Sequence, residues 1–144
     1  IEIMEKRGVK NTECKDFFEY SKSGYDTILF LMNGIGLIQS IENFPVFFTK
    51  ISELLSPTGQ VLIDSSDLCY LFENEDGSFD FPLNSEYYGQ VDFTVEFEGN
   101  FSELFNWVYV DFNTLQYAAN NAGFECELVA KGEHYDFLAR ITRK

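Results

Sequence analysis

The fold class is decided by residues 25–67, which read YDTILFLMNGIGLIQSIENFPVFFTKISELLSPTGQVLIDSSD. Tyr25 to Met32 is a continuous apolar stretch without a polar face, which is typical of a strand in a parallel sheet covered by helices. Glu42 to Leu55 has apolar side chains at helical spacing and predicts a helix that Asn43 can cap. Gln60 to Ile63 predicts a second buried strand. A strand, a helix and a strand in this order predict a right-handed βαβ unit in an α/β fold.

Shorter elements are predicted on both sides of this unit. Before it, we expect a helix over Ile1 to Arg7, ended by Gly8, and a short strand over Thr12 to Asp16. After it, alternating apolar residues predict an antiparallel hairpin, formed by Val91 to Glu98 and Glu103 to Val110. The remaining expectations are a helix over Thr114 to Asn121, capped by Asp111 or Asn113 and stopped by Gly123, and two strands over Phe124 to Ala130 and Asp136 to Ile141.

Composition limits the possible partners and the compartment. The chain has 144 residues, of which 45% are hydrophobic and 17% aromatic, so it can bury one core as a single domain over 1–144. The net charge of -14 disfavours nucleic acid and anionic membrane surfaces, because both attract clustered Lys and Arg. Cys14, Cys69 and Cys126 are far apart and form no metal-ligand pattern, which favours a reducing, cytoplasmic location without a metal site.

A partial nucleotide-binding motif follows the first strand of the unit. Gly34 and Gly36 begin a G-x-G-x-x-G pattern, and Asp64 ends the next predicted strand, where an NAD-binding fold places its ribose-binding acid. Gln39 replaces the third glycine, and the helix is predicted to begin only near Asn43. A dinucleotide-dependent oxidoreductase therefore stays as an alternative rather than the main hypothesis, beside a non-catalytic α/β module.

The order of the elements gives a better match. YDTILFLMNG, the Leu-Leu-Ser-Pro-Thr-Gly turn within ISELLSPTGQVLIDSSD, and the segments FNTLQYAANNAGFECELV and HYDFLARITRK follow one another along the chain. In this order they resemble the class I S-adenosylmethionine-dependent methyltransferases over essentially the whole chain. The resemblance implies a Rossmann-like sheet of strand order 3-2-1-4-5-7-6 with only the seventh strand antiparallel. It identifies Thr12 to Asp16 as the third strand and Tyr25 to Met32 as the fourth.

The resemblance also implies S-adenosylmethionine as cofactor and assigns residues to it. Asp16 is expected to accept a hydrogen bond from the adenine amino group, and the Phe17 backbone amide to meet the ring. Met32, Asn33 and Gly34 end the fourth strand, and in this family that position lies beside the methyl sulfonium. Gly34 and Gly36 lack side chains, which would let a ligand approach closely. The family's Asn-Pro-Pro-Tyr type of motif is absent, which disfavours nucleobase amines as acceptors.

Candidate acceptor-binding residues follow the fifth strand of that order. Asp64, Ser65, Ser66 and Asp67 are expected at the ligand edge of the sheet, although turn chemistry explains such residues equally well. Residues 68–110, with Asp76-Gly77 and Pro82, are predicted to form an acidic, aromatic lid, in which Tyr70, Tyr87 and Tyr88 contact a small-molecule acceptor or form the lid's own core. His134, the only histidine, is either a general base or a solvated turn residue.

The family's Gly-rich cofactor loop and the acid that ends its second strand have no counterpart in this sequence. We therefore expect an N-terminally truncated domain that binds S-adenosylmethionine weakly or not at all and is inactive by itself. The family places its first and second strands between the third and fourth. Without them, the fourth strand is expected at a sheet edge, where it pairs either with a second copy to form a homodimer, which we favour, or with the Thr12 to Asp16 strand.

Overall fold

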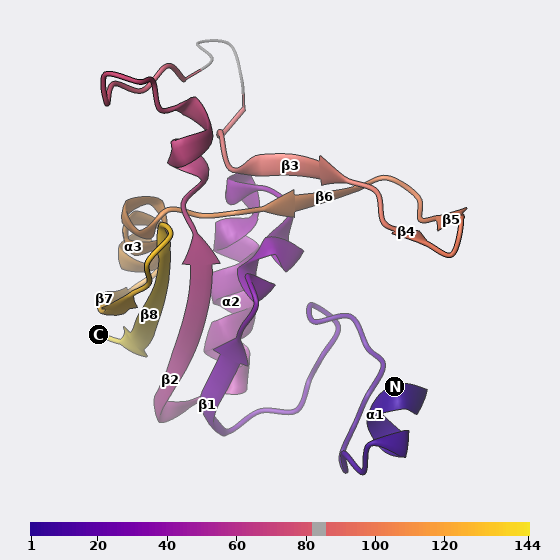
Figure 1. Ribbon diagram of the computed structural model, residues 1–144. Coiled ribbons are helices and arrows are strands. Elements are labelled where there is room, and N and C mark those ends of the chain that lie inside the picture. Colours follow the sequence, from indigo (N-terminus) through magenta and orange to yellow (C-terminus); the bar gives the residue numbers. More distant parts are fainter. Residues whose placement is uncertain (82–85) are drawn as a thin grey trace.

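The computed structural model describes residues 1–81 and 86–144, arranged around a four-stranded sheet of order β1-β2-β8-β7 (Figure 1). The strands are Tyr25–Phe30 (β1), Leu55–Ser66 (β2), Phe124–Lys131 (β7) and Asp136–Arg143 (β8). β1 and β2 are parallel, with Ile28 opposite Val61. β8 is antiparallel to both of its neighbours. This mixed α/β sheet confirms the expected order of strands four, five, seven and six, with the seventh strand antiparallel.

Two helices cover one face of the sheet: Phe44–Leu54 (α2) and Phe112–Asn121 (α3) (Figure 1). Phe47 and Ile51 of α2 and Leu115 of α3 are fully buried against this face. Each such side chain contributes roughly 1.5–3 kcal/mol to folding when it leaves water. The alternation of buried and half-buried residues along β2 follows from this one-sided cover.

β1 is less buried than its sequence predicted. Phe30 is buried beneath the helices, whereas Leu29 is 55% exposed and Leu31 is 50% exposed on the opposite face. The expectation of a strand buried on both faces is therefore wrong for the described chain, because its helices cover a single face. The expected position of this strand at the edge of the sheet is confirmed.

The N-terminal segment contains one predicted helix but not the predicted strand. The short helix Glu2–Lys6 (α1) is followed, after Arg7, by Gly8, whose φ of +78° is a backbone conformation that glycine adopts without a steric penalty. Thr12 to Asp16 forms no strand, because no described strand lies beside it to supply backbone hydrogen bonds. The segment after it is held instead by aromatic packing, with the Phe17 ring 5.2 Å from that of Phe30.

Two short 3₁₀ helices, Gly34–Ile38 (η1) and Ile41–Asn43 (η2), connect β1 to α2. Asn43 stands at the position that precedes α2, as predicted, but its side chain donates a hydrogen bond to the Ile38 carbonyl oxygen at 2.8 Å and caps no helix amide. The Leu-Leu-Ser-Pro-Thr-Gly turn expected from the sequence, residues 54–59, coincides with an irregularity at the start of β2. There Tyr25 pairs with Leu55, while Thr27 already pairs with Gln60.

The segment between β2 and α3 contains a 3₁₀ helix, Leu68–Phe72 (η3), and two small antiparallel ladders that project sideways (Figure 1). The ladders pair Gln90–Phe93 (β3) with Phe105–Val108 (β6), and Glu96–Phe97 (β4) with Asn100–Phe101 (β5). The predicted hairpin is thus present but interrupted. At the interruption, the Ser102 amide donates a hydrogen bond to the Val95 carbonyl oxygen at 2.8 Å, and the Ser102 hydroxyl accepts one from the Val95 amide at 2.9 Å. Pro82 lies outside the described residues.

The C-terminal elements agree with their prediction. Asp111, rather than Asn113, caps α3, because its Oδ1 accepts a 3.0 Å hydrogen bond from the Thr114 amide. Gly123 follows the helix with a φ of +85°, and β7 and β8 then complete the sheet.

Candidate functional site

The carboxyl ends of β1 and β2 meet at one edge of the sheet, where open α/β sheets bind their ligands. Asp64 near the end of β2 accepts hydrogen bonds from two backbone amides that follow β1: Met32 at 3.0 Å and Asn33 at 2.6 Å. Both amides belong to residues in the left-handed region, with φ of 59° and 56°. Such a backbone is costly for residues with a side chain, and the Asp64 carboxylate offsets that cost.

A second polar connection holds the same edge from inside. The buried Ser65 hydroxyl donates to Asn33 Oδ1 at 2.7 Å and accepts from the Val110 amide at 2.9 Å. Asn33 Nδ2 reaches the Val108 carbonyl oxygen at 3.4 Å. The side chains of Asn33, Asp64 and Ser65 therefore fix the ends of β1, β2 and β6 relative to one another. Asp64 and Ser65 therefore have structural hydrogen bonds, and their expected contact with an acceptor stays a prediction.

Of the two glycines of this loop, Gly36 does not open space for a ligand. A Cβ at Gly36 would lie 1.9 Å from Trp107 Nε1, so the indole occupies the space that glycine leaves. A Cβ at Gly34 would meet Phe30 Cβ at an ordinary 3.5 Å. Met32, by contrast, is 92% exposed at the end of β1, so this side chain and the adjoining backbone remain open to a ligand.

Asp16 and Phe17 have different surroundings. Asp16 Oδ1 accepts a hydrogen bond from the Phe18 amide at 2.7 Å, and Asp16 lines a cavity of about 310 Å³ together with Leu37 and Gln39. The Phe17 ring packs edge-on against Phe30. The expected ligand contact of Phe17 therefore involves its backbone amide rather than its ring.

The three lid tyrosines are not equivalent. The Tyr87 hydroxyl donates to Asp111 Oδ2 at 2.7 Å and accepts from the Asp111 amide at 2.8 Å. The Tyr88 hydroxyl donates to Asp67 Oδ1 at 2.6 Å. Burial, together with these carboxylates, raises the pKa of both phenols. Tyr87 and Tyr88 thus anchor the lid, whereas Tyr70 is 45% exposed.

Tyr70 lines a cavity of about 630 Å³ beside the end of β2. Its floor includes Ser66, and its walls come from η3, from β3 and the end of β6, and from the turn between β7 and β8. The lining residues are Ser66, Leu68, Tyr70, Leu71, Val91, Phe93, Tyr109, His134 and Tyr135. The structure therefore brings Ser66, Tyr70 and His134 together. Sequence reasoning did not select Phe93, Tyr109 or Tyr135, and only the alternation along 91–98 pointed to Phe93.

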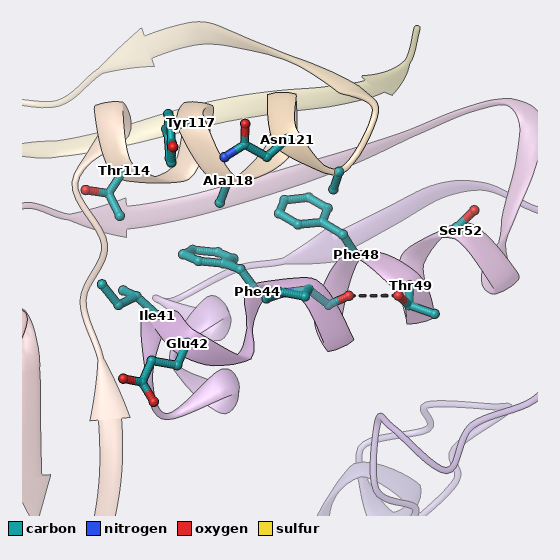
Figure 2. A pocket seen from close by; sticks show the side chains of 12 residues that line it. Ile41, Glu42, Phe44, Phe48, Thr49, Ser52, Thr114, Tyr117, Ala118 and Asn121 are labelled. Atoms are coloured by element: carbon teal, nitrogen blue, oxygen red, sulfur yellow. Dashed lines mark hydrogen bonds between the residues drawn. The ribbon is translucent and has the colours of Figure 1, made fainter.

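A second, slightly larger hollow of about 690 Å³ lies between α2 and α3 (Figure 2). Phe44 and Phe48 rise from α2 toward Ala118 on α3, and Thr49 bonds only its own helix, donating to the Pro45 carbonyl oxygen at 2.8 Å. Because this groove belongs to the helical layer and contains none of the predicted site residues, the candidate site is the sheet edge with the cavity beside it.

No group of three or more His, Cys, Asp or Glu side chains within residues 1–81 and 86–144 is arranged to hold a metal ion. Among the helices of these two ranges, none has the length and apolar character needed to cross a bilayer.

Comparison with known proteins places the chain. It is 48% identical to an S-adenosylmethionine-dependent methyltransferase from Bacteroides fragilis, solved in complex with S-adenosyl-L-homocysteine, with a TM-score of 0.89 over 99% of this chain. The chain is thus similar to the class I S-adenosylmethionine-dependent methyltransferases over nearly its whole length. The chain spans 58% of the length of the B. fragilis protein. No protein-family model matches it, and no curated protein matches it either.

More distant solved structures share the fold alone. An S-adenosylmethionine-dependent methyltransferase from Clostridium acetobutylicum is 12% identical, with a TM-score of 0.62 over 99% of this chain and 68% of its own. The sugar N-methyltransferase KedS8 from a Streptoalloteichus species is 14% identical, with a TM-score of 0.59 over 96% of this chain and 65% of its own. The dinucleotide alternative loses its support, because the segment after β1 forms η1 with the Trp107 indole against Gly36.

Proposed function

We propose that this chain takes part in methyl transfer from S-adenosylmethionine to a small-molecule acceptor. The observation that carries the proposal is the 48% identity, over 99% of the chain, to a methyltransferase crystallised with S-adenosyl-L-homocysteine. The cofactor supplies a methyl group on a sulfonium. An acceptor atom attacks it in line, so the protein needs to position the two reactants and exclude water rather than provide a nucleophile.

The residues at the sheet edge fit a cofactor of this chemistry. Asp16 places a carboxylate at a small cavity with apolar and amide neighbours, which suits the amino group of an adenine. The exposed Met32 side chain and the backbone of Asn33 and Gly34, held by Asp64, form the part of the site proposed for the sulfonium end. The acceptor is assigned to the cavity beside Ser66, and the lid over 68–110 covers it. Tyr87 and Tyr88 act indirectly, by anchoring that lid.

The cofactor assignment is tested by titration calorimetry with S-adenosylmethionine on the protein that contains this chain. Asp16→Ala is expected to weaken binding by about 1–3 kcal/mol, the cost of a hydrogen-bonding group left unpaired. Asp80→Ala changes an exposed carboxylate of the lid and serves as the matched control. An affinity unchanged by Asp16→Ala removes Asp16 from the site. A protein that neither binds S-adenosylmethionine nor converts it to S-adenosylhomocysteine with any acceptor contradicts the proposed function.

We also propose a homodimer through the outer edge of β1. In the described residues no strand pairs with this edge, and Leu29 and Leu31 are half exposed beside it. An apolar strand with unpaired backbone groups is a template for pairing with a second copy.

The acidity of the chain supports the absence of nucleic-acid and membrane partners. Three free thiols support a cytoplasmic location.

A further inference from the structure

The cavity beside Ser66 has walls that are mainly aromatic. Tyr70 of η3 lies against Tyr135 of the β7–β8 turn, with ring centroids 5.7 Å apart. On another wall, Phe93 of β3 lies 6.3 Å from Tyr109. Rings contributed by separate segments therefore border one space of about 630 Å³. Aromatic faces carry a negative quadrupole and attract cations placed over them.

The charged groups around the cavity also favour a cation. Glu73 accepts a 3.0 Å hydrogen bond from the Tyr135 hydroxyl, and this bond raises the pKa of Tyr135, so the ring stays a neutral phenol beside a carboxylate. Asp67 follows Ser66 and holds Tyr88. Among the described lining residues there is no lysine or arginine. A positive group entering the cavity thus meets aromatic rings, one of which is hydrogen-bonded to the Glu73 carboxylate, and no basic side chain of the described lining opposes it.

We propose, building on the proposed function, that this cavity selects an amine as the methyl acceptor and that His134 takes up the amine's proton. The amine enters as an ammonium ion. His134, the only imidazole of the chain, lies on the lining and accepts one proton from it. The nitrogen lone pair then forms a bond to the methyl carbon as the carbon–sulfur bond breaks and its electron pair stays on sulfur. The positive charge moves from sulfur to nitrogen, which the aromatic walls and carboxylates favour. A hydroxyl acceptor gains less, because its product is neutral.

The binding test uses three probes with the same ring and different charges at pH 7: cyclohexylammonium, cyclohexanol and cyclohexanecarboxylate. Because His134 is the only histidine, its ring protons give a single set of NMR signals that reports on the cavity. We expect cyclohexylammonium to shift these signals saturably, with an affinity at least tenfold above that of either other probe. Equal binding of the alcohol, or stronger binding of the carboxylate, overturns the selection of an amine.

Two variants test whether cyclohexylammonium binds in this cavity. Tyr70→Leu removes one ring of the cavity and is expected to weaken cyclohexylammonium at least threefold. Tyr117→Leu changes a tyrosine of α3 that is 71% exposed outside the cavity, and should leave the affinity unchanged. Equal losses in both variants, or none in Tyr70→Leu, overturn the location. Displacement of the probe by S-adenosylhomocysteine would assign the cavity to the cofactor instead.

A turnover assay distinguishes the amine inference from the proposed methyltransferase function. With S-adenosylmethionine and a panel of amine and hydroxyl acceptors, we expect S-adenosylhomocysteine to form with amines. His134→Gln should lower that turnover at least tenfold while leaving cyclohexylammonium affinity within twofold. Unchanged turnover in this variant assigns the proton to solvent and removes His134. Turnover with hydroxyl acceptors alone overturns the amine inference but leaves the methyltransferase intact. Ammonium binding without any cofactor binding contradicts the proposed methyltransferase function but leaves the cation selectivity of the cavity intact.

Discussion

Asp64 accepts a 2.6 Å hydrogen bond from the backbone amide of Asn33, across the parallel pair of strands whose ends form the candidate site. Its other oxygen accepts from the amide of Met32 at 3.0 Å. A carboxylate near the end of one strand thereby fixes the conformation of the loop that follows the neighbouring strand. The position that resembles the sulfonium-binding turn of the family is thus held in place by a residue of the neighbouring strand.

Replacing this carboxylate tests that relationship. Asp64→Asn substitutes an amide nitrogen for one acceptor oxygen, so one of the two backbone amides loses its partner. We expect the free energy of unfolding to fall by about 1–3 kcal/mol. Urea denaturation measures the change, with Asp80→Asn as the exposed control. A variant as stable as the parent would mean that water replaces the carboxylate at no cost.

The Tyr87 anchor predicts both a stability loss and a pH dependence. Tyr87→Phe leaves the Asp111 carboxylate and amide without their 2.7 and 2.8 Å partner, and should cost about 1–3 kcal/mol. Burial raises the pKa of Tyr87 in the folded state, so its contribution is complete below about pH 10 and is lost as the pH rises further. Urea unfolding between pH 8 and pH 11 should show a shallower decline in Tyr87→Phe. Tyr117→Phe, at an exposed phenol, should behave as the parent.

The three thiols should react at different rates. Burial raises the pKa of Cys126 from 9.0 to about 11, and burial with Asp67 nearby raises the pKa of Cys69 to about 11. At pH 8 a rise of this size lowers the thiolate population about 100-fold. Cys14 is exposed. Iodoacetamide should therefore modify Cys14 at least about tenfold faster than the other two thiols, as followed by peptide mass spectrometry. Modification of Cys126 at the same rate as Cys14 would show that β7 opens readily.

The outer edge of β1 predicts concentration-dependent assembly of the 144-residue chain. Backbone pairing there would satisfy the unpaired amides and carbonyls of this strand edge, so we expect a two-fold dimer in sedimentation equilibrium. Thr27→Pro removes a backbone donor from β1 and should shift the equilibrium toward monomer. Val46→Ser is the control, because it changes an exposed apolar residue of α2 and leaves the strand edge unchanged. A folded species that stays monomeric at high concentration contradicts the dimer.

The sequence by itself determined the βαβ unit, the two flanking helices and the final strand pair. These depend on local information: apolar spacing along 44–55, the Asp111 cap, and Gly8 and Gly123 at helix ends. The order of these pieces was enough to indicate the methyltransferase family. It also placed Asp16 and the Met32 to Gly34 turn at the ligand edge as candidates, which stay predictions.

Only the tertiary structure decided what the polar and aromatic residues do. Asp64 and Ser65 follow a strand in sequence, yet their partners lie about thirty residues before them or forty-five after them. Tyr135 meets Glu73 across 62 residues, and the cavity exists because these distant segments converge. Thr12 to Asp16 failed as a strand for the same reason. A strand, a polar connection and a cavity each need a partner from elsewhere in the chain, and spacing along the sequence carries no record of which segment supplies it.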